Sequence, residues 1–277
     1  MYILGVSWRL SSKPPKEPET LAEPSQSATI ASFDGTVIHY DYYDAPRSQL
    51  IVIVPGFWRS KAHPSMRRIA ALTRGLGLKT AVVDVRGHGE SGGTYGFNLH
   101  EHEDVARVAR ELLSQTDARD VALIGLSLGG EIAISTIARH ELPWNGLLVI
   151  SPVAQFERIA PKINLLTIHR HIAFGQAFRR PRFDWHFRKS AKLDGLADIA
   201  SVRVPICLIH VENDWLIHHS HSVALYDRAH EPKELHILDI QGNFHADRVF
   251  SVAPERVEPL MIDFLERISG GQTKEPR

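Results

Sequence analysis

The chain has 277 residues, of which 43% are hydrophobic and 23% charged, an ordinary balance for one or two folded domains in water. Its 32 basic and 32 acidic side chains cancel, so the overall charge does not indicate a nucleic-acid partner. The single cysteine, Cys207, excludes an internal disulfide, and its aliphatic neighbours predict a small buried side chain. No apolar run approaches the ~20 residues that span a bilayer, so we expect no transmembrane segment.

Residues 1–28 predict a flexible leader, because residues 11–28 are rich in Ser, Pro, Lys and Glu and poor in large hydrophobic side chains. The apolar first six residues have no basic residue before them and no clear small-residue cleavage site after them, so a signal peptide is not expected. We therefore expect a cytoplasmic location. For the first ten residues, docking on the domain and peripheral contact with a membrane both stay open.

From residue 29 onward, short apolar strands alternate with helical patterns. Residues 29–33 and 37–43 flank Asp34-Gly35, which predicts a hairpin. Fully apolar strands that alternate with helices predict an α/β domain over residues 29–268, with a mostly parallel, twisted sheet covered by helices on both faces. Residues 269–277 form a tail. The remaining strands are expected at 50–54, 80–85, 121–126, 146–150, 205–211 and 234–240, and the helices at 64–76, 101–115, 128–139, 219–229 and 255–268.

Residues 153–200 interrupt this alternation and predict a small cap. Its segment 156–190 carries eight basic and two acidic side chains, interleaved with six aromatic ones. One interpretation is that the aromatic side chains pack the cap on the domain and the charges are solvated. The other is that the cap holds an acyl chain while its basic rim attracts an anionic group. The second interpretation predicts that reversing Arg179, Arg180 and Arg182 raises KM for an anionic ester and spares a neutral one. The substrate-binding candidates in the cap are Phe178, Phe183, Arg179 and Arg180.

The most informative motif is G-x-S-x-G at residues 125–129, between an expected strand and an expected helix. In that setting it predicts a nucleophile elbow, a sharp turn that exposes the hydroxyl of Ser127. Gly125 and Gly129 fit the positions at which a Cβ would crowd the turn. The helix that follows directs its amide end toward the site. Ser127 is therefore the candidate nucleophile, and the alternative is a tight turn that contains an uninvolved serine.

A serine nucleophile needs a general base, and that base needs an orienting acid. In this fold class the chain order is Ser, then Asp or Glu, then His, with each residue just past the carboxyl end of a strand. Asp214 follows the strand at 205–211, and His245 follows the strand at 234–240. Glu212 and Asp239 are the rival acids. They rank lower because Glu212 comes two residues earlier and Asp239 lies at the end of its strand.

The oxyanion of a tetrahedral intermediate needs two positioned donors. The main-chain N–H of Leu128 follows the nucleophile directly, and the N–H of Phe57 lies in the loop after the strand at 50–54. Trp58 and Trp215 flank this loop and the acid. They are candidates to line the acyl pocket, and packing residues are an equal alternative.

Together, three motifs make the chain resemble the α/β-hydrolase-fold serine hydrolases. They are Pro55-Gly56-Phe57, D-x-R-G-H-G-x-S at residues 84–91, and the elbow with its acid and base. The resemblance covers about residues 29–268, to the group that holds monoglyceride-lipase-like esterases, thioesterases and serine-aminopeptidase-like members. It implies a serine nucleophile with no cofactor, and structural roles for His88 and Ser91. Pro55 stands where many members have a histidine that helps hold the oxyanion loop, a departure that concerns the hydrogen bonding of that loop and not the fold.

The expected activity is hydrolysis of a small-molecule carboxylic ester through an acyl-enzyme on Ser127. A thioesterase of the same mechanism is the first alternative, and a ligand-binding protein without activity is the second. A peptidase is less favoured because no distinct acidic cluster for a peptide amino terminus is evident. No metal-ligand motif or dinucleotide fingerprint occurs, so neither a metal nor a cofactor is expected. No nucleic-acid partner is expected, and the oligomeric state is left open.

Overall fold

The computed structural model describes residues 23–155, 182 and 194–270. In this part of the chain, eight strands form one sheet in the order β1-β2-β4-β3-β5-β6-β7-β8. The hairpin strand β2 runs antiparallel to both β1 and β4, and every other neighbouring pair is parallel. The strands are β1 (Gln26–Ala31), β2 (Val37–Tyr43), β3 (Arg47–Val54), β4 (Leu78–Val83), β5 (Asp120–Leu126), β6 (Trp144–Ile150), β7 (Ile206–Val211) and β8 (Lys233–Leu238).

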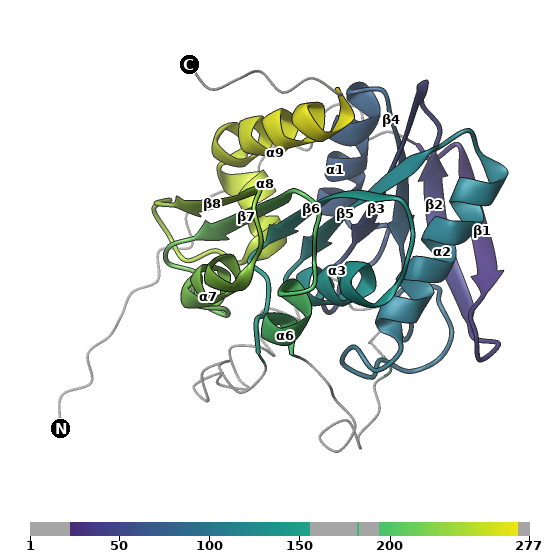
Figure 1. Cartoon of the computed structure of the whole chain (residues 1–277), viewed down its shortest axis with the longest axis horizontal. Coiled ribbons are helices and arrows are strands. Elements are labelled where there is room, and N and C mark those ends of the chain that lie inside the picture. The colour runs from purple at the N-terminus through teal and green to yellow at the C-terminus, as the bar shows by residue number, and fades with distance from the viewer. Residues whose placement is uncertain (1–22, 156–181, 183–193, 271–277) are drawn as a thin grey trace.

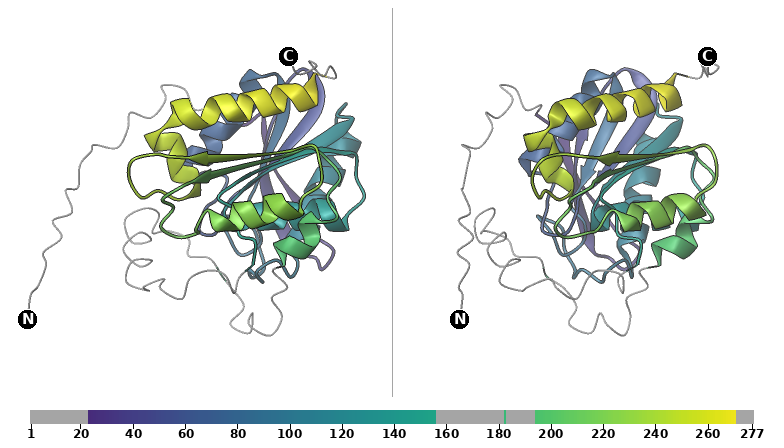
Figure 2. Two further views of the ribbon diagram at one scale, coloured as in Figure 1. Left: turned by 60° about the vertical axis from the view of Figure 1, so that its left-hand side comes forward. Right: turned by 90° about the vertical axis from the view of Figure 1, so that its left-hand side faces the viewer.

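Helices cover both faces of this sheet. Figures 1 and 2 show α9 and α1 against one face, and α3, α6 and α7 against the other. None of the described helices is long and apolar enough to cross a bilayer. The helices are α1 (Pro64–Gly75), α2 (Glu101–Gln115), α3 (Leu128–Arg139), α6 (Gly195–Ile199), α7 (Ser220–Arg228), α8 (Val249–Val252) and α9 (Pro254–Ser269), with a 3-10 turn, η2 (Ala246–Arg248).

The central strands are buried on both faces, and their side chains alternate between two cores. Leu50 and Val52 of β3 belong to the core shared with α2, α3, α6 and α7, whereas Ile51 and Ile53 belong to the core shared with α1, α8 and α9. This alternation follows from the two-residue period of a strand. Continuous apolar runs in the sequence are therefore strands between two helical layers, as expected for a parallel sheet.

Several element bounds differ from those expected from the sequence, and two short elements that follow His245 were not expected. The leader was expected to extend to residue 28, whereas β1 begins at Gln26 and pairs with Tyr42 of β2. Strand β4 ends at Val83, and Asp84 already belongs to the loop that follows it. The turn η2 and helix α8, which follow His245, had no signal in the sequence pattern. Both are short, and their local sequence carries no clear helical period.

The two ends of the predicted cap meet at its base. Gln155 and Asp194 form an isolated antiparallel bridge, and the Gln155 side chain donates to the Asp194 carboxylate at 3.2 Å. Val153 at one end and Ile199 at the other are fully buried in the core under α3. The insertion therefore leaves and re-enters the domain at one place. Phe178, Arg179, Arg180 and Phe183 lie outside the described residues.

Candidate active site

Ser127 lies on a tight turn between β5 and α3, with φ at 54° and ψ at −124°. This conformation is unfavourable for a residue with a Cβ, and such strain persists where the surrounding structure holds it. The two flanking glycines explain how it is held. A Cβ on Gly125 would lie 2.5 Å from the carbonyl oxygen of Gly129, and one on Gly129 would lie 2.2 Å from the carbonyl oxygen of Val54. The elbow therefore requires glycine at both positions, as the motif predicts.

His245 lies between Ser127 and Asp214, which come from two other loops. The Oγ of Ser127 is 2.8 Å from Nε2 of His245, and Nδ1 of His245 is 2.8 Å from Oδ2 of Asp214. Since a carboxylate can only accept, Nδ1–H donates to Asp214, and Nε2 is left to accept the serine hydroxyl proton. The structure thus brings together the three residues that the sequence analysis selected.

The carboxylate of Asp214 is fully buried, and its partners hold it in the charged form. Its Oδ1 accepts the main-chain N–H groups of Leu216 and Ile217 at 2.9 and 3.0 Å. Burial alone would raise the pKa of Asp214, but the neighbouring His245 and these hydrogen bonds hold the pKa below its usual value. A charged Asp214 can therefore orient His245 and stabilise its protonated ring.

The rival acids do not share this environment. Glu212 and Asp239 are both exposed, and neither side chain is hydrogen-bonded or ion-paired to His245 within the described part of the chain. The geometry therefore distinguishes Asp214 from acids that are close to it in sequence.

His210 was not singled out in the sequence, yet it supports the loop that carries Asp214. Its Nε2–H donates to the carbonyl oxygen of Ile217 at 2.9 Å, and its Nδ1 accepts from the hydroxyl of Ser222 at 2.7 Å. Burial lowers its pKa to about 4, so the ring is neutral near pH 7. Its signal in the sequence is weak, because the chain has 16 histidines and nothing in the local sequence sets this one apart.

The loop after β3 lies directly against the elbow. A Cβ on Gly56 would lie 3.0 Å from the carbonyl oxygen of Leu126 and 3.1 Å from the Cβ of Ser127. This contact places the next residue, Phe57, beside the nucleophile. Leu128 begins α3, so its N–H belongs to the first turn, where main-chain donors have no partner within the helix. Both predicted oxyanion donors are therefore in segments that border Ser127.

Aromatic rings surround the same loop. The Phe57 ring packs on those of Trp58, His88 and Tyr95 at centroid distances of 4.3, 5.1 and 5.1 Å. The Trp215 ring lies 6.5 Å from that of His245, at an angle of 77°. Both tryptophans are half-buried. This exposure fits a residue that lines an acyl pocket and a packing residue equally well, so both interpretations stay open.

His88 and Ser91 have structural positions, as expected. The Ser91 hydroxyl donates to the carbonyl oxygen of Asp84 at 2.6 Å and accepts the N–H of His39 at 2.8 Å. The Nδ1 of His88 bonds the carbonyl oxygen of Arg86, and burial lowers the pKa of His88 to about 4. These contacts close the loop after β4 on itself, and neither side chain is hydrogen-bonded to the three residues at the elbow.

Arg182 is exposed and is bonded to the loop after β4, and its expected role toward an anionic substrate stays a prediction. Its guanidinium donates to the main-chain carbonyl oxygens of Gly93, at 3.1 Å, and of Ser91. The guanidinium thus serves as a hydrogen-bond donor to the loop after β4, because main-chain carbonyl groups that are not bonded within a loop need other partners. Arg179 and Arg180 lie outside the described residues, and the reversal of all three arginines remains the test of an anionic substrate.

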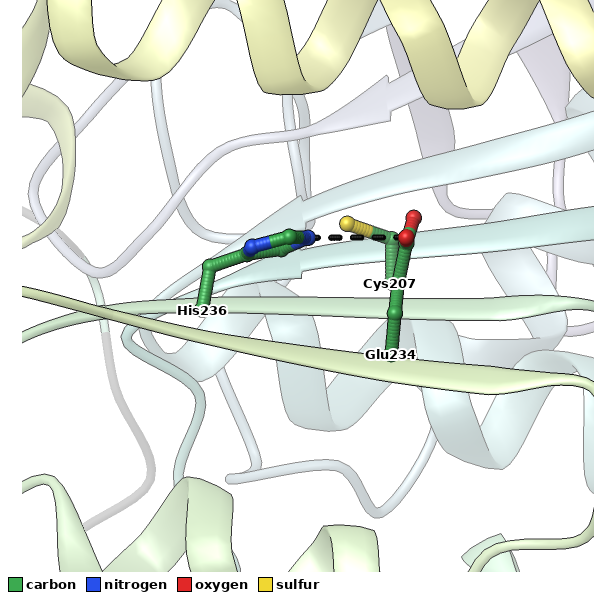
Figure 3. Close-up of side chains that lie close together, drawn as sticks. All are labelled: Cys207, Glu234 and His236. Carbon is green, nitrogen blue, oxygen red and sulfur yellow. Dashed lines mark ion pairs between the residues drawn. The ribbon is translucent and has the colours of Figure 1, made fainter. Parts of the chain in front are cut away.

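A second cluster of chemically active side chains lies between β7, β8 and α9. Figure 3 shows Cys207, Glu234 and His236, whose ligand-type atoms lie within 4.8 Å of one another. Arg267 of α9 donates to Oε1 of Glu234 at 2.6 Å, and Oε2 lies 3.5 Å from Nε2 of His236. Cys207 is fully buried, as predicted, and burial raises the pKa of its thiol well above the usual range. Since the Glu234 carboxylate is already paired with the guanidinium of Arg267, we assign no ligand to this cluster.

Comparison with known proteins agrees with this architecture. The family model described as serine aminopeptidase, S33, matches residues 45–198, more than half of the chain. The uncharacterized hydrolase YugF of Bacillus subtilis is 24% identical over 130 residues, which cover 47% of this chain and 46% of that protein. The chain thus spans about half the length of the curated relatives it matches first.

Solved structures cover more of the chain. The Pyrococcus furiosus esterase Pf2001 has a TM-score of 0.71 and 19% identity, with 89% of this chain and 93% of that chain covered. Mouse alpha/beta hydrolase domain-containing protein 10 has a TM-score of 0.67 and 19% identity, with 88% and 100% covered. Together with the strand order and the tight turn at Ser127, these matches show that the chain adopts the α/β-hydrolase fold and belongs to the serine aminopeptidase S33 family.

Proposed function

We propose that the protein is a serine hydrolase that cleaves a carboxylic ester through an acyl-enzyme on Ser127. The observation that carries this proposal is the continuous set of hydrogen bonds from Ser127 through His245 to Asp214. A serine hydroxyl is a weak nucleophile near pH 7, and the imidazole of His245, whose Nε2 lies 2.8 Å from it, is placed to act as the general base that it needs.

In the first half of the reaction, Oγ of Ser127 attacks the ester carbonyl carbon and its proton passes to Nε2 of His245. Asp214 stabilises the imidazolium that forms. When the tetrahedral intermediate collapses, the C–O bond to the alcohol breaks and His245 returns the proton to the leaving oxygen. Water then attacks the acyl-enzyme in the same way, with His245 as base, and releases the acid and Ser127.

The developing oxyanion would be stabilised by the main-chain N–H groups of Leu128 and Phe57. Leu128 has the added advantage of the positive end of the α3 dipole. Pro55 replaces the histidine that supports this loop in many relatives. In this chain, the packing of Phe57 against His88 and Tyr95 supplies an alternative support.

An ester is preferred to an amide because Pf2001, a structure of similar fold, is described as an esterase. The family description names an aminopeptidase, so the substrate test includes an amide. A thioester is the remaining competitor, since the same acyl-enzyme accepts a thiol leaving group.

Labelling with a fluorophosphonate, read by intact mass, tests the proposal. Wild type and Ser151→Ala should gain one adduct, and Ser127→Ala none. Ser151 is a matched control because it is a buried serine with φ at 47° at the end of the neighbouring strand β6. Folded wild type that takes no label would contradict an activated Ser127.

The substrate class is tested on wild-type enzyme that has not been exposed to the label. We expect kcat/KM for p-nitrophenyl esters to exceed that for acyl thioesters and for aminoacyl p-nitroanilides of matched chain length. Turnover that favours the thioester would replace the ester proposal with a thioesterase, and turnover that favours the anilide would replace it with a peptidase.

A further inference from the structure

A buried carboxylate stands two residues beyond His245. Asp247 lies in η2, and its side chain is 8% exposed. Its Oδ2 accepts from Nε of Arg59 at 3.1 Å and from the hydroxyl of Ser65, in the first turn of α1, at 3.3 Å. Asp247 therefore connects the segment that carries the proposed base to the segment that links β3 and α1, which is 188 residues away in the sequence.

Arg59 follows the proposed oxyanion donor in the same way that Asp247 follows the proposed base. It is two residues beyond Phe57, and its N–H donates to the carbonyl oxygen of Gly56 at 3.0 Å. That bond closes a four-residue turn in which Phe57 and Trp58 are the central residues. A shift of the Arg59 side chain would therefore be transmitted to the turn that contains the proposed oxyanion donor.

Each member of the pair directly follows a residue with a strained main chain. Trp58 has φ at 64° and Ala246 has φ at 42°, in the left-handed region that favours glycine. A non-glycine residue keeps such a conformation only where neighbouring contacts hold it. The ion pair between Arg59 and Asp247 is a contact of this kind, because it joins the two strained turns to each other.

His63 also faces Asp247 but does not supply the balancing charge. Its Nδ1 lies 3.8 Å from Oδ2 of Asp247 and accepts the N–H of Ser65 as the cap of α1. Burial lowers the pKa of His63 to about 4, so its ring is neutral near pH 7. Among the described side chains in contact with Asp247, the positive charge comes from Arg59.

We propose that Arg59 and Asp247 form a positioning pair that holds the His245 loop and the Phe57 loop in register around Ser127. This inference rests on the proposed function, since it assigns the pair to the geometry of that reaction. The pair touches no reacting atom. It acts by fixing where the base and the oxyanion donor lie when the transition state forms.

The test compares Arg59→Met, Asp247→Asn and the double variant in hydrolysis of a p-nitrophenyl ester. We expect each single variant to lower kcat by about 100-fold, the loss that a misplacement of ~1 Å can produce. KM should change little, and the double variant should lose no more than either single one, because both remove the same contact. Arg59→Lys keeps the charge and should recover part of kcat.

A matched pair controls for stability. Arg68 of α1 and Glu258 of α9 form a comparable ion pair at 2.6 Å that bonds no residue of the site. Arg68→Met should change the unfolding midpoint without changing kcat of the folded enzyme. If Asp247→Asn fails to fold, Arg59→Met and Arg59→Lys carry the comparison.

The outcomes separate the two proposals. Wild type that neither labels nor turns over ester would overturn the proposed function. Wild type that is active while Arg59→Met and Asp247→Asn keep its kcat would overturn the pair alone. Losses of kcat that add in the double variant, or that Arg68→Met reproduces at a similar drop in unfolding midpoint, would make the pair structural and would also overturn the inference.

Discussion

The main-chain N–H of Arg182 donates to the carbonyl oxygen of Gly87 at 2.9 Å, so a residue of the predicted cap is bonded directly to the loop after β4. The carbonyl oxygen of Arg182 accepts in turn from the N–H of Tyr95 at 2.7 Å. The Tyr95 ring packs on Phe57. One residue of the insertion is thereby separated from the proposed oxyanion loop by a single aromatic side chain.

This contact requires glycine at position 87. A Cβ there would lie 2.3 Å from the carbonyl oxygen of Arg182 and 2.6 Å from the nitrogen of Tyr95, and φ is 76°. We expect Gly87→Ala to lower the free energy of unfolding by more than Gly35→Ala. Gly35 has a similar φ, at 80°, but open space around it, so its substitution costs about 1–2 kcal/mol of backbone strain alone. Urea unfolding of both variants checks this, and equal losses would show that Arg182 does not constrain position 87.

Removing the charge of Asp214 should stop the reaction without unfolding the protein. Asp214→Asn keeps the size of the side chain, but its amide favours the wrong tautomer of His245. We expect kcat to fall about 10⁴-fold, as for the corresponding change in other serine hydrolases. Steady-state kinetics with circular dichroism measures this. Glu212→Gln is the control because Glu212 is an exposed neighbouring acid, and a comparable loss in that variant would reopen the choice of acid.

Glu131, in the first turn of α3, should make the protein less stable as pH rises. It is fully buried, and burial raises its pKa well above the usual value. Its Oε1 accepts from Asn98 and Ser135, at 2.8 and 3.2 Å. In the unfolded chain it loses its proton near pH ~4.3, so between that pH and the folded pKa stability falls by about 1.4 kcal/mol per pH unit.

Glu131→Gln removes this proton linkage while keeping an acceptor oxygen. We expect its advantage in unfolding free energy over wild type to grow from pH 5 to pH 8, measured by urea unfolding. Glu266 of α9 is exposed, so the stability of Glu266→Gln should follow the same pH dependence as wild type. Parallel curves for Glu131→Gln as well would mean that Glu131 is ionised in the folded protein.

Arg86, in the loop after β4, is a buried cation that is paired with two carboxylates. It is 3% exposed and binds Asp104 through Nε at 2.6 Å and Nη2 at 2.7 Å, with Asp34 at 2.9 Å on its far side. Arg86→Met would leave Asp104 buried without its cation, so we expect a loss of about 3–5 kcal/mol in urea unfolding. Arg86→Met/Asp104→Leu should recover most of it, because removing both charges leaves neither unpaired. A double variant as unstable as the single one would refute this account.

Local sequence determined much of this protein. The apolar strands, their alternation with helices and the limits of α2 and α3 follow from hydrophobic periodicity. The elbow follows from glycine chemistry, since only residues without a Cβ fit at 125 and 129. Chain order and the ends of parallel strands then select Asp214 and His245 over their sequence neighbours.

Only the tertiary structure decided which polar side chains from distant loops contact one another, because hydrophobic periodicity does not encode such contacts. No sequence pattern predicts that Arg59 and Asp247, which are far apart in the chain, form an ion pair. His210 is distinguished by its hydrogen bond to the loop of Asp214, which only the folded chain provides. Arg182 is similar to its basic neighbours in sequence, yet it is bonded to Gly87 because that glycine lets the chain approach closely. Periodicity reports which face of an element is apolar, whereas such contacts depend on where the folded loops meet in space.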